Sequence, residues 1–105
     1  NKNERWERVE GLVSSENPGD WRVAIIEADV MLDELISAMG YEGVTLGEKL
    51  KRIEKSDMTT LDSAWEAHKI RNKVAHRGTD FILTRREAKR VIGLYRNALQ
   101  EFDYV

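Results

Sequence analysis

Basic and polar side chains between residues 67 and 78 have the chemical types needed to handle a phosphodiester. The forked guanidinium of Arg71 could hold two non-bridging phosphate oxygens at once. Imidazole exchanges protons near neutral pH, so His76 could give or take a proton during cleavage. Asn72 lies four residues before His76, on the same side of a helix, and could orient that ring. We therefore take Arg71, Asn72 and His76 as the candidate catalytic residues.

Helical spacing decides which of these side chains could act together. His68, Asn72 and His76 form one row, because a helix has about 3.6 residues per turn. Arg71 and His76 are about 140° apart around the helix, so sharing one target requires an unwound helix end or a second copy of the chain. The candidate substrate-binding residues are the nearby cationic or titratable side chains His68, Lys73, Arg77, Arg85 and Arg86.

The sequence from Arg71 to His76, Arg-Asn-Lys-Val-Ala-His, resembles the signature of the HEPN superfamily of small helical-bundle domains. The motif itself covers residues 64–78, and the expected number and order of helices extend the resemblance over most of the chain. It implies metal-independent RNA cleavage at a homodimer interface, where Arg71 and His76 of both chains converge on one cleft. Many superfamily domains act instead as interaction or nucleotide-binding modules, so a non-catalytic interaction domain is the competing interpretation.

Purely structural roles also account for the same residues. Asn72 could be a buried amide, and His76 could interact with the dipole at the end of its helix. His68 fits a packed histidine. We expect no cofactor and no metal site, since His68 and His76 lie about 12 Å apart along the helix axis. Arg71 could pair with an acidic residue of an earlier helix: Glu27, Asp29, Asp33 or Glu34.

Arg85, Arg86, Lys89 and Arg90 form a basic cluster at the expected start of the last helix. Cations in a first helical turn oppose the helix dipole, which hints at an external anion. The alternative interpretation is an ordinary solvated face of a charged helix.

Composition limits the classes of protein to which the chain can belong. A length of 105 residues, 41% of them hydrophobic and 34% charged, fits one globular domain. The absence of cysteine excludes a disulfide framework, a thiolate metal site and a cysteine nucleophile. Residues 1–63 carry 8 Lys and Arg against 14 Asp and Glu, whereas residues 64–105 carry 9 against 5. If a polyanion such as RNA binds, it should therefore bind the second half.

Apolar periodicity is helical throughout, which predicts an all-α fold. Asn17, Thr45 and Thr84 each precede an acidic residue by three positions, as N-caps do, while Gly40 and Gly78 are expected to end helices. We expect a HEPN-like, four-helix up-and-down bundle over residues 17–105, preceded by a lead-in helix or linker over residues 1–16. The expected helices cover about residues 4–14, 18–39, 46–55, 60–77 and 85–102.

The sequence also leads to expectations about the location of the domain and its partners. No segment is apolar enough to span a membrane, and no signal peptide opens the chain, so we expect a cytoplasmic location. The chain begins with Asn1 rather than Met, which suggests a piece of a longer protein, such as the cytosolic part of an anchored one. The expected partners are a second copy of the chain and RNA or a nucleotide.

Overall fold

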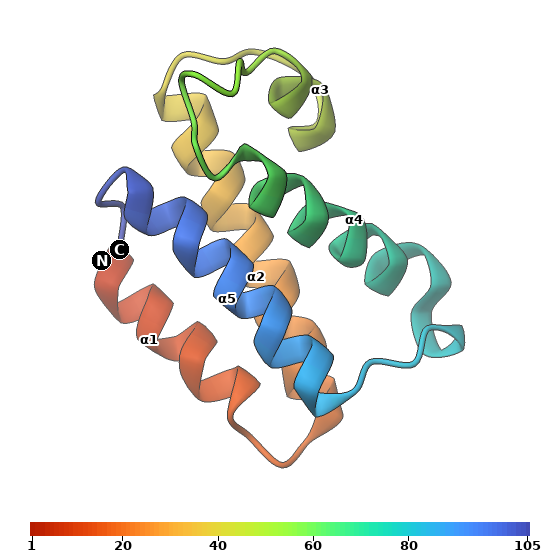
Figure 1. Cartoon of the computed structure of the whole chain (residues 1–105). Coiled ribbons are helices and arrows are strands. Elements are labelled where there is room, and N and C mark those ends of the chain that lie inside the picture. The colour runs from red at the N-terminus through yellow and green to blue at the C-terminus, as the bar shows by residue number, and fades with distance from the viewer.

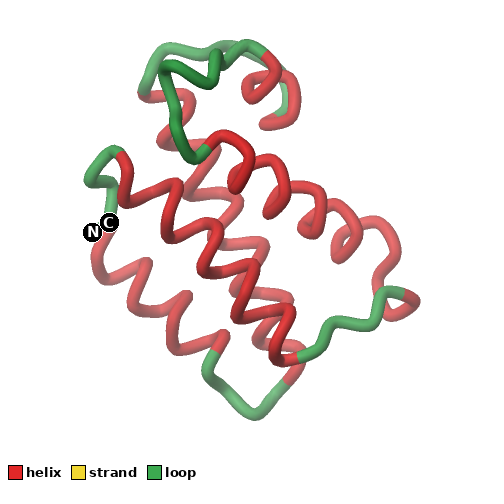
Figure 2. Tube along the Cα trace, viewed as in Figure 1, coloured by secondary structure: helices red, strands yellow, loops and turns green.

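Five α-helices joined by short connections form the fold in the computed structural model, which describes residues 1–105 (Figures 1 and 2). No strand is present, so the all-α prediction is confirmed. None of the helices is both long and apolar enough to cross a bilayer. The elements are α1 (Lys2–Val13), α2 (Pro18–Ala38), α3 (Leu46–Lys51), α4 (Leu61–Arg77), a 3₁₀ turn (Gly78–Asp80) and α5 (Arg85–Glu101).

Side-chain caps fix the starts of α2, α3 and α5 at the predicted residues. The side chain of Asn17 accepts a hydrogen bond from the Gly19 N–H at 2.9 Å. Thr45 and Thr84 accept in the same way from the N–H groups three residues later. Each cap satisfies a donor that the first helical turn leaves without a partner. Local sequence is sufficient to place these helix starts.

The helices are arranged around a central pair, α2 and α5, with α1 and α4 on either side (Figure 1). Both central helices contact both flanking helices, whereas α1 and α4 do not meet. Successive long helices run in opposite directions, so the connections gather at the two ends of the bundle (Figure 2). Fully buried side chains at the centre include Tyr95, Ile25, Leu32 and Leu99.

The four helices of the bundle are not the four that were expected. Helix α1 buries Trp6, Val9 and Val13 in the common core, so it is a full member of the bundle. Helix α3 ends at Lys51 rather than near Lys55 and lies over one end of the bundle (Figure 1). Residues 54–57 are all polar and exposed, and therefore offer no apolar face that would continue that helix.

The start of α4 is capped by a side chain from the far end of the sequence. Thr60 makes no side-chain cap of its own. Instead the Glu101 carboxylate accepts hydrogen bonds from the Thr59 and Thr60 N–H groups at 2.9 and 2.8 Å, and from the Thr60 hydroxyl at 2.5 Å. Burial would raise the pKa of the Glu101 carboxyl, but these hydrogen bonds lower it below its usual value.

Replacing Glu101 with glutamine is expected to lower the free energy of unfolding at pH 7 by about 1 kcal/mol, because a charged cap is lost. A carboxyl whose pKa is lowered in the folded state stabilises fully above the unfolded value of about 4.3. That contribution disappears as the pH falls through the folded value. Urea unfolding between pH 7 and pH 3 measures this: the difference between the two proteins should be full at pH 7 and shrink as the pH falls below about 4.3, and a constant difference would contradict the assignment.

Candidate functional site

A groove of about 550 Å³ lies between α4, α2 and the start of α3 with the residues just before it. Four of the predicted site residues line it, namely His68, Arg71, Asn72 and His76. The opposite wall contains two carboxylates of α2, those of Asp29 and Asp33. The remaining lining residues are Val30, Val44, Thr45, Leu46 and Gly47.

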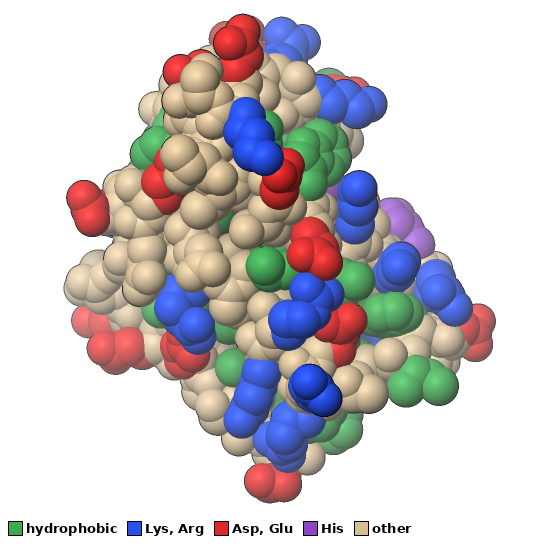
Figure 3. All heavy atoms as spheres, viewed as in Figure 1, with side chains coloured by type: hydrophobic (Ala, Val, Ile, Leu, Met, Phe, Trp, Pro, Cys, Tyr) green, Lys and Arg blue, Asp and Glu red, His purple; other side chains and the backbone are tan.

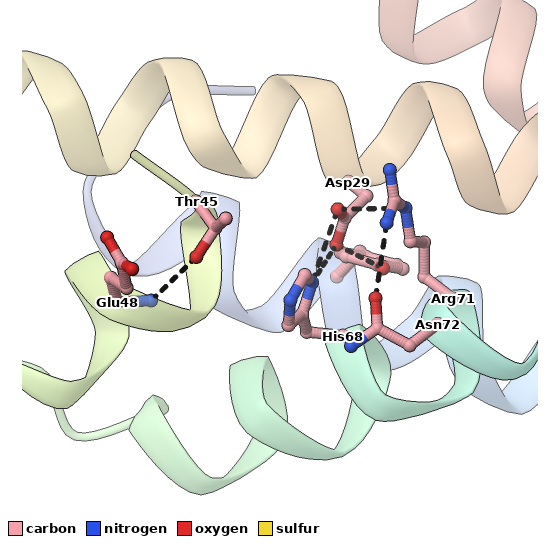
Figure 4. A network of polar contacts seen from close by, with 7 residues as sticks. Asp29, Thr45, Glu48, His68, Arg71 and Asn72 are labelled. Atoms are coloured by element: carbon pink, nitrogen blue, oxygen red, sulfur yellow. Dashed lines mark hydrogen bonds and ion pairs between the residues drawn. The ribbon is translucent and has the colours of Figure 1, made fainter. Parts of the chain in front are cut away.

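Asp29 is the centre of a buried polar network beneath this groove (Figure 4). Only 5% of the residue is exposed. Its Oδ1 accepts a hydrogen bond from the Tyr95 hydroxyl at 2.7 Å and lies 3.0 Å from Nδ1 of His68. Burial, followed by the charge of Asp29 and this hydrogen bond, raises the pKa of Tyr95 well above its usual value. Tyr95 therefore remains a hydrogen-bond donor to the carboxylate.

Arg71 contacts the same carboxylate from the other side. Its Nε lies 3.4 Å from Oδ2 of Asp29, which is an ion pair, but the N–H is not directed at the oxygen and makes no hydrogen bond. Its Nη1 donates to the side-chain oxygen of Asn72 at 3.1 Å. The side chain of Arg71 remains 32% exposed. Of the four acids considered from the sequence, the partner of Arg71 is Asp29.

Asn72 has a different partner from the one suggested by the helical spacing. It accepts the hydrogen bond from Arg71 and makes none with His76. His76 is exposed and makes no hydrogen bond or ion pair within the chain. The amide therefore positions the guanidinium, while the His76 ring is held by no neighbour.

The two histidines of the groove occupy contrasting environments. His68 is 7% exposed and is held through Nδ1 by Asp29. Its Nε2 makes no hydrogen bond within the chain, is not sealed from solvent, and faces the turn at Gly47. A Cβ at Gly47 would lie 3.7 Å from this nitrogen. His68 thus combines a fixed ring with a nitrogen that faces the groove.

Other predicted binding residues lie outside the groove. Lys73 and Arg77 are exposed on α4, with the Arg77 guanidinium 5.6 Å from the Phe81 ring centroid. Arg85 is occupied by structural contacts: it pairs with Glu16 at 3.1 Å and lies 4.9 Å from the Trp21 ring centroid. Arg86 is exposed and makes no ion pair.

The basic cluster of α5 is consequently partly neutralised. Arg90 pairs with both Glu66 and Glu87, which leaves Arg86 and Lys89 as its exposed, unpaired members. On the face shown in Figure 3, Lys and Arg side chains gather toward the start of α5 with acidic side chains among them. This surface is mixed in charge rather than a continuous basic patch.

A second hollow, of about 720 Å³, opens on the outer side of α4 and contains none of the predicted site residues. Its lining consists of Asp62, Trp65, Glu66 and Lys69. Across the molecule, no three His, Asp or Glu side chains are close enough together to hold a metal ion.

The central position of Asp29 was the feature that sequence reasoning missed. The signal was its place on the apolar face of α2, four residues after Ile25 and three before Leu32, where a carboxylate requires buried partners. No local pattern in the sequence connected Tyr95 with Asp29, or residues 44–47 with α4. Comparisons with protein-family models, curated proteins and solved structures gave no match. The proposed function therefore rests on the geometry of the groove.

Proposed function

We propose that this chain is a HEPN-like domain that binds RNA in the groove along α4 and cleaves it without a metal ion, with a second copy completing the site. One observation carries the proposal: the motif residues Arg71, Asn72 and His76 all line the same solvent-exposed groove. A row of side chains on one helix does not by itself guarantee this, because neighbouring helices could have covered any of them.

The chemistry of these groups suits a phosphodiester. Arg71 is held by Asn72 and its side chain is 32% exposed in the groove, so it can bind a phosphate oxygen and stabilise the charge that develops on it. His76 is exposed and uncommitted, which suits proton transfer. The angle of about 140° between Arg71 and His76 on one regular helix favours a site shared by two copies.

The competing function is a non-catalytic interaction domain. The observation that favours it is the pairing of Arg71 with Asp29, a contact that gives the arginine a structural role. An ion pair with a buried carboxylate helps to fix the relative position of α2 and α4 whether or not any reaction occurs.

Replacing His76 with alanine is expected to lower the rate of RNA cleavage about 100-fold or more while leaving the unfolding temperature unchanged, because His76 is exposed and makes no hydrogen bond or ion pair within the chain. The assay uses labelled single-stranded RNA in the presence of EDTA and identifies 2′,3′-cyclic phosphate ends. Lys69→Ala is the matched control, since Lys69 is exposed on the same helix but outside the groove. If the unaltered protein cuts no RNA under these conditions, the non-catalytic function stands instead.

A further inference from the structure

We propose that Arg71 and His68 of one chain together contact a phosphate in the groove, with Nε2 of His68 as the atom that exchanges a proton. This inference rests on the proposed RNA-directed function, but it assigns a role to a residue outside the Arg-Asn-His motif. In this arrangement Asp29 is a positioning residue, because it contacts both His68 and Arg71.

Position on the helix favours His68 over His76 as the partner of Arg71 within a chain. Three residues separate His68 from Arg71, so their side chains are about 60° apart around the helix and about 4.5 Å apart along its axis. The corresponding separations for His76 are about 140° and 7.5 Å. Both His68 and Arg71 contact the carboxylate of Asp29, and Figure 4 shows them on either side of it. One small anion can therefore reach both groups.

The state of each ring nitrogen of His68 follows from its surroundings. Nδ1 faces two acceptors, Oδ1 and Oδ2 of Asp29, at 3.0 and 3.3 Å, so Nδ1 carries a hydrogen. Oδ1 is also fixed by the Tyr95 hydroxyl, which prevents the carboxylate from turning away. Proton exchange is then confined to Nε2, the nitrogen that has no partner within the chain.

Arg71 likewise has nitrogens that contact other side chains and one nitrogen that does not. Nη1 is occupied by Asn72, and Nε lies against Asp29. Nη2 makes no hydrogen bond within the chain, and the side chain is 32% exposed. The side chains of His68 and Arg71, which carry these free nitrogens, thus both contact Asp29 and both line the groove.

The two carboxylates of the groove do not prevent an anion from binding there. Asp29 is compensated by Arg71 and by two hydrogen-bond donors. Asp33 pairs with Lys49 at 2.6 Å, and Lys49 also donates to Ser37. Neither carboxylate faces the groove as an uncompensated charge.

In the cleavage step, Nε2 of His68 takes the proton of the ribose 2′-hydroxyl. The 2′ oxygen then forms a bond to phosphorus, and the bond from phosphorus to the 5′ oxygen breaks. The leaving 5′ oxygen takes a proton from His76 of the second copy. The products are a 2′,3′-cyclic phosphate and a free 5′-hydroxyl, and Nη2 of Arg71 holds a non-bridging oxygen throughout.

The decisive measurement is a titration of ¹⁵N-histidine-labelled protein with inorganic phosphate and, separately, with uridine 3′-monophosphate. Signals from the Nε2 of His68 are expected to shift and saturate with both ligands, and Nδ1 should report a bound hydrogen. Arg71→Lys should weaken the nucleotide response about tenfold or more, because lysine has no counterpart of Nη2 held in place by contacts with Asn72 and Asp29. A response confined to His76, or none at all, would overturn the assignment, whatever the cleavage assay shows.

Cleavage by the two histidine variants separates this inference from the proposed function. His68→Asn retains an N–H donor toward Asp29 but has no Nε2, so folding should be preserved while cleavage falls about 100-fold or more. His76→Asn makes the same substitution at the second histidine of the helix. Cleavage should fall in that variant too, because His76 of the second copy protonates the leaving oxygen. If the protein cleaves RNA and His68→Asn cleaves at the full rate, the inference is wrong and the proposed function stands. If phosphate shifts His68 but no RNA is cut, the phosphate pair stands and the nuclease proposal fails.

Gly47→Ala tests access to Nε2 without altering the network. The added methyl would lie 3.7 Å from Nε2 of His68, an ordinary contact distance, so the fold should be unaffected. The phosphate-induced shift at His68 should weaken severalfold. Gly11→Ala on α1 is the control, since its added carbon would meet nothing within 4 Å. An equal response in both variants would count against Nε2 as the contacting atom.

Discussion

Replacing Asp29 with alanine is expected to lower the free energy of unfolding by about 3 kcal/mol, because three side chains lose a partner together. The substitution removes at one stroke the acceptor of Tyr95, the acceptor of His68 and the counter-charge of Arg71. Two of these three groups are buried, and water cannot readily replace the lost partner. Urea unfolding followed by far-ultraviolet circular dichroism measures the effect.

Asp33→Ala is the matched control for this prediction. It removes a carboxylate one turn further along α2 whose ion pair with Lys49 is 42% exposed on the aspartate side. The Lys49 side chain is only 13% exposed, but it keeps its hydrogen bond to Ser37, so the cost should be about 1 kcal/mol. Asp29→Asn should fall between the two, because the amide oxygen can still accept a hydrogen bond while the charge is lost. Equal losses for Asp29→Ala and Asp33→Ala would show that the network does not stabilise the fold.

Removing residues 1–16 is expected to abolish cooperative folding of the remainder. Helix α1 contributes three buried side chains to the common core, those of Trp6, Val9 and Val13. At about 1.5–3 kcal/mol for each buried side chain, the loss of all three amounts to roughly 4.5–9 kcal/mol, comparable with the whole stability of a small domain. Calorimetry of the chain starting at Asn17 should show no sharp unfolding transition.

A single substitution provides the comparison for this deletion. Trp6→Ala in the full chain should cost about 3–5 kcal/mol and leave a weakened but cooperative transition. Glu7→Ala, on the exposed side of the same helix, should change the stability by less than about 0.5 kcal/mol. If residues 17–105 alone unfold at the temperature of the full chain, α1 is an appendage, as the lead-in interpretation holds.

The sequence by itself determined where most of the helices begin and which side of each faces inward. Asn17, Thr45 and Thr84 cap the helices that follow them as their types and spacing predict. These contacts span only two or three residues, so the local chain contains all the information they need. The same reasoning placed Arg71 and Asn72 near the end of a long helix.

Tertiary packing decided which partners these side chains have. From the sequence, any of four acidic residues could pair with Arg71. The packing of α2 against α4 places Asp29, and not the other three, next to it. The contacts of Asp29 with His68 and Tyr95 cross 39 and 66 residues of chain. Glu101 caps α4 across a similar distance, 41 residues from Thr60.

Periodicity identifies the buried face of a helix but not the helix that covers it. For that reason the sequence could place α1 beside the bundle or within it, and could not bring residues 44–47 against α4. The groove exists because three segments distant in the chain pack together, so its lining could be known only from the fold.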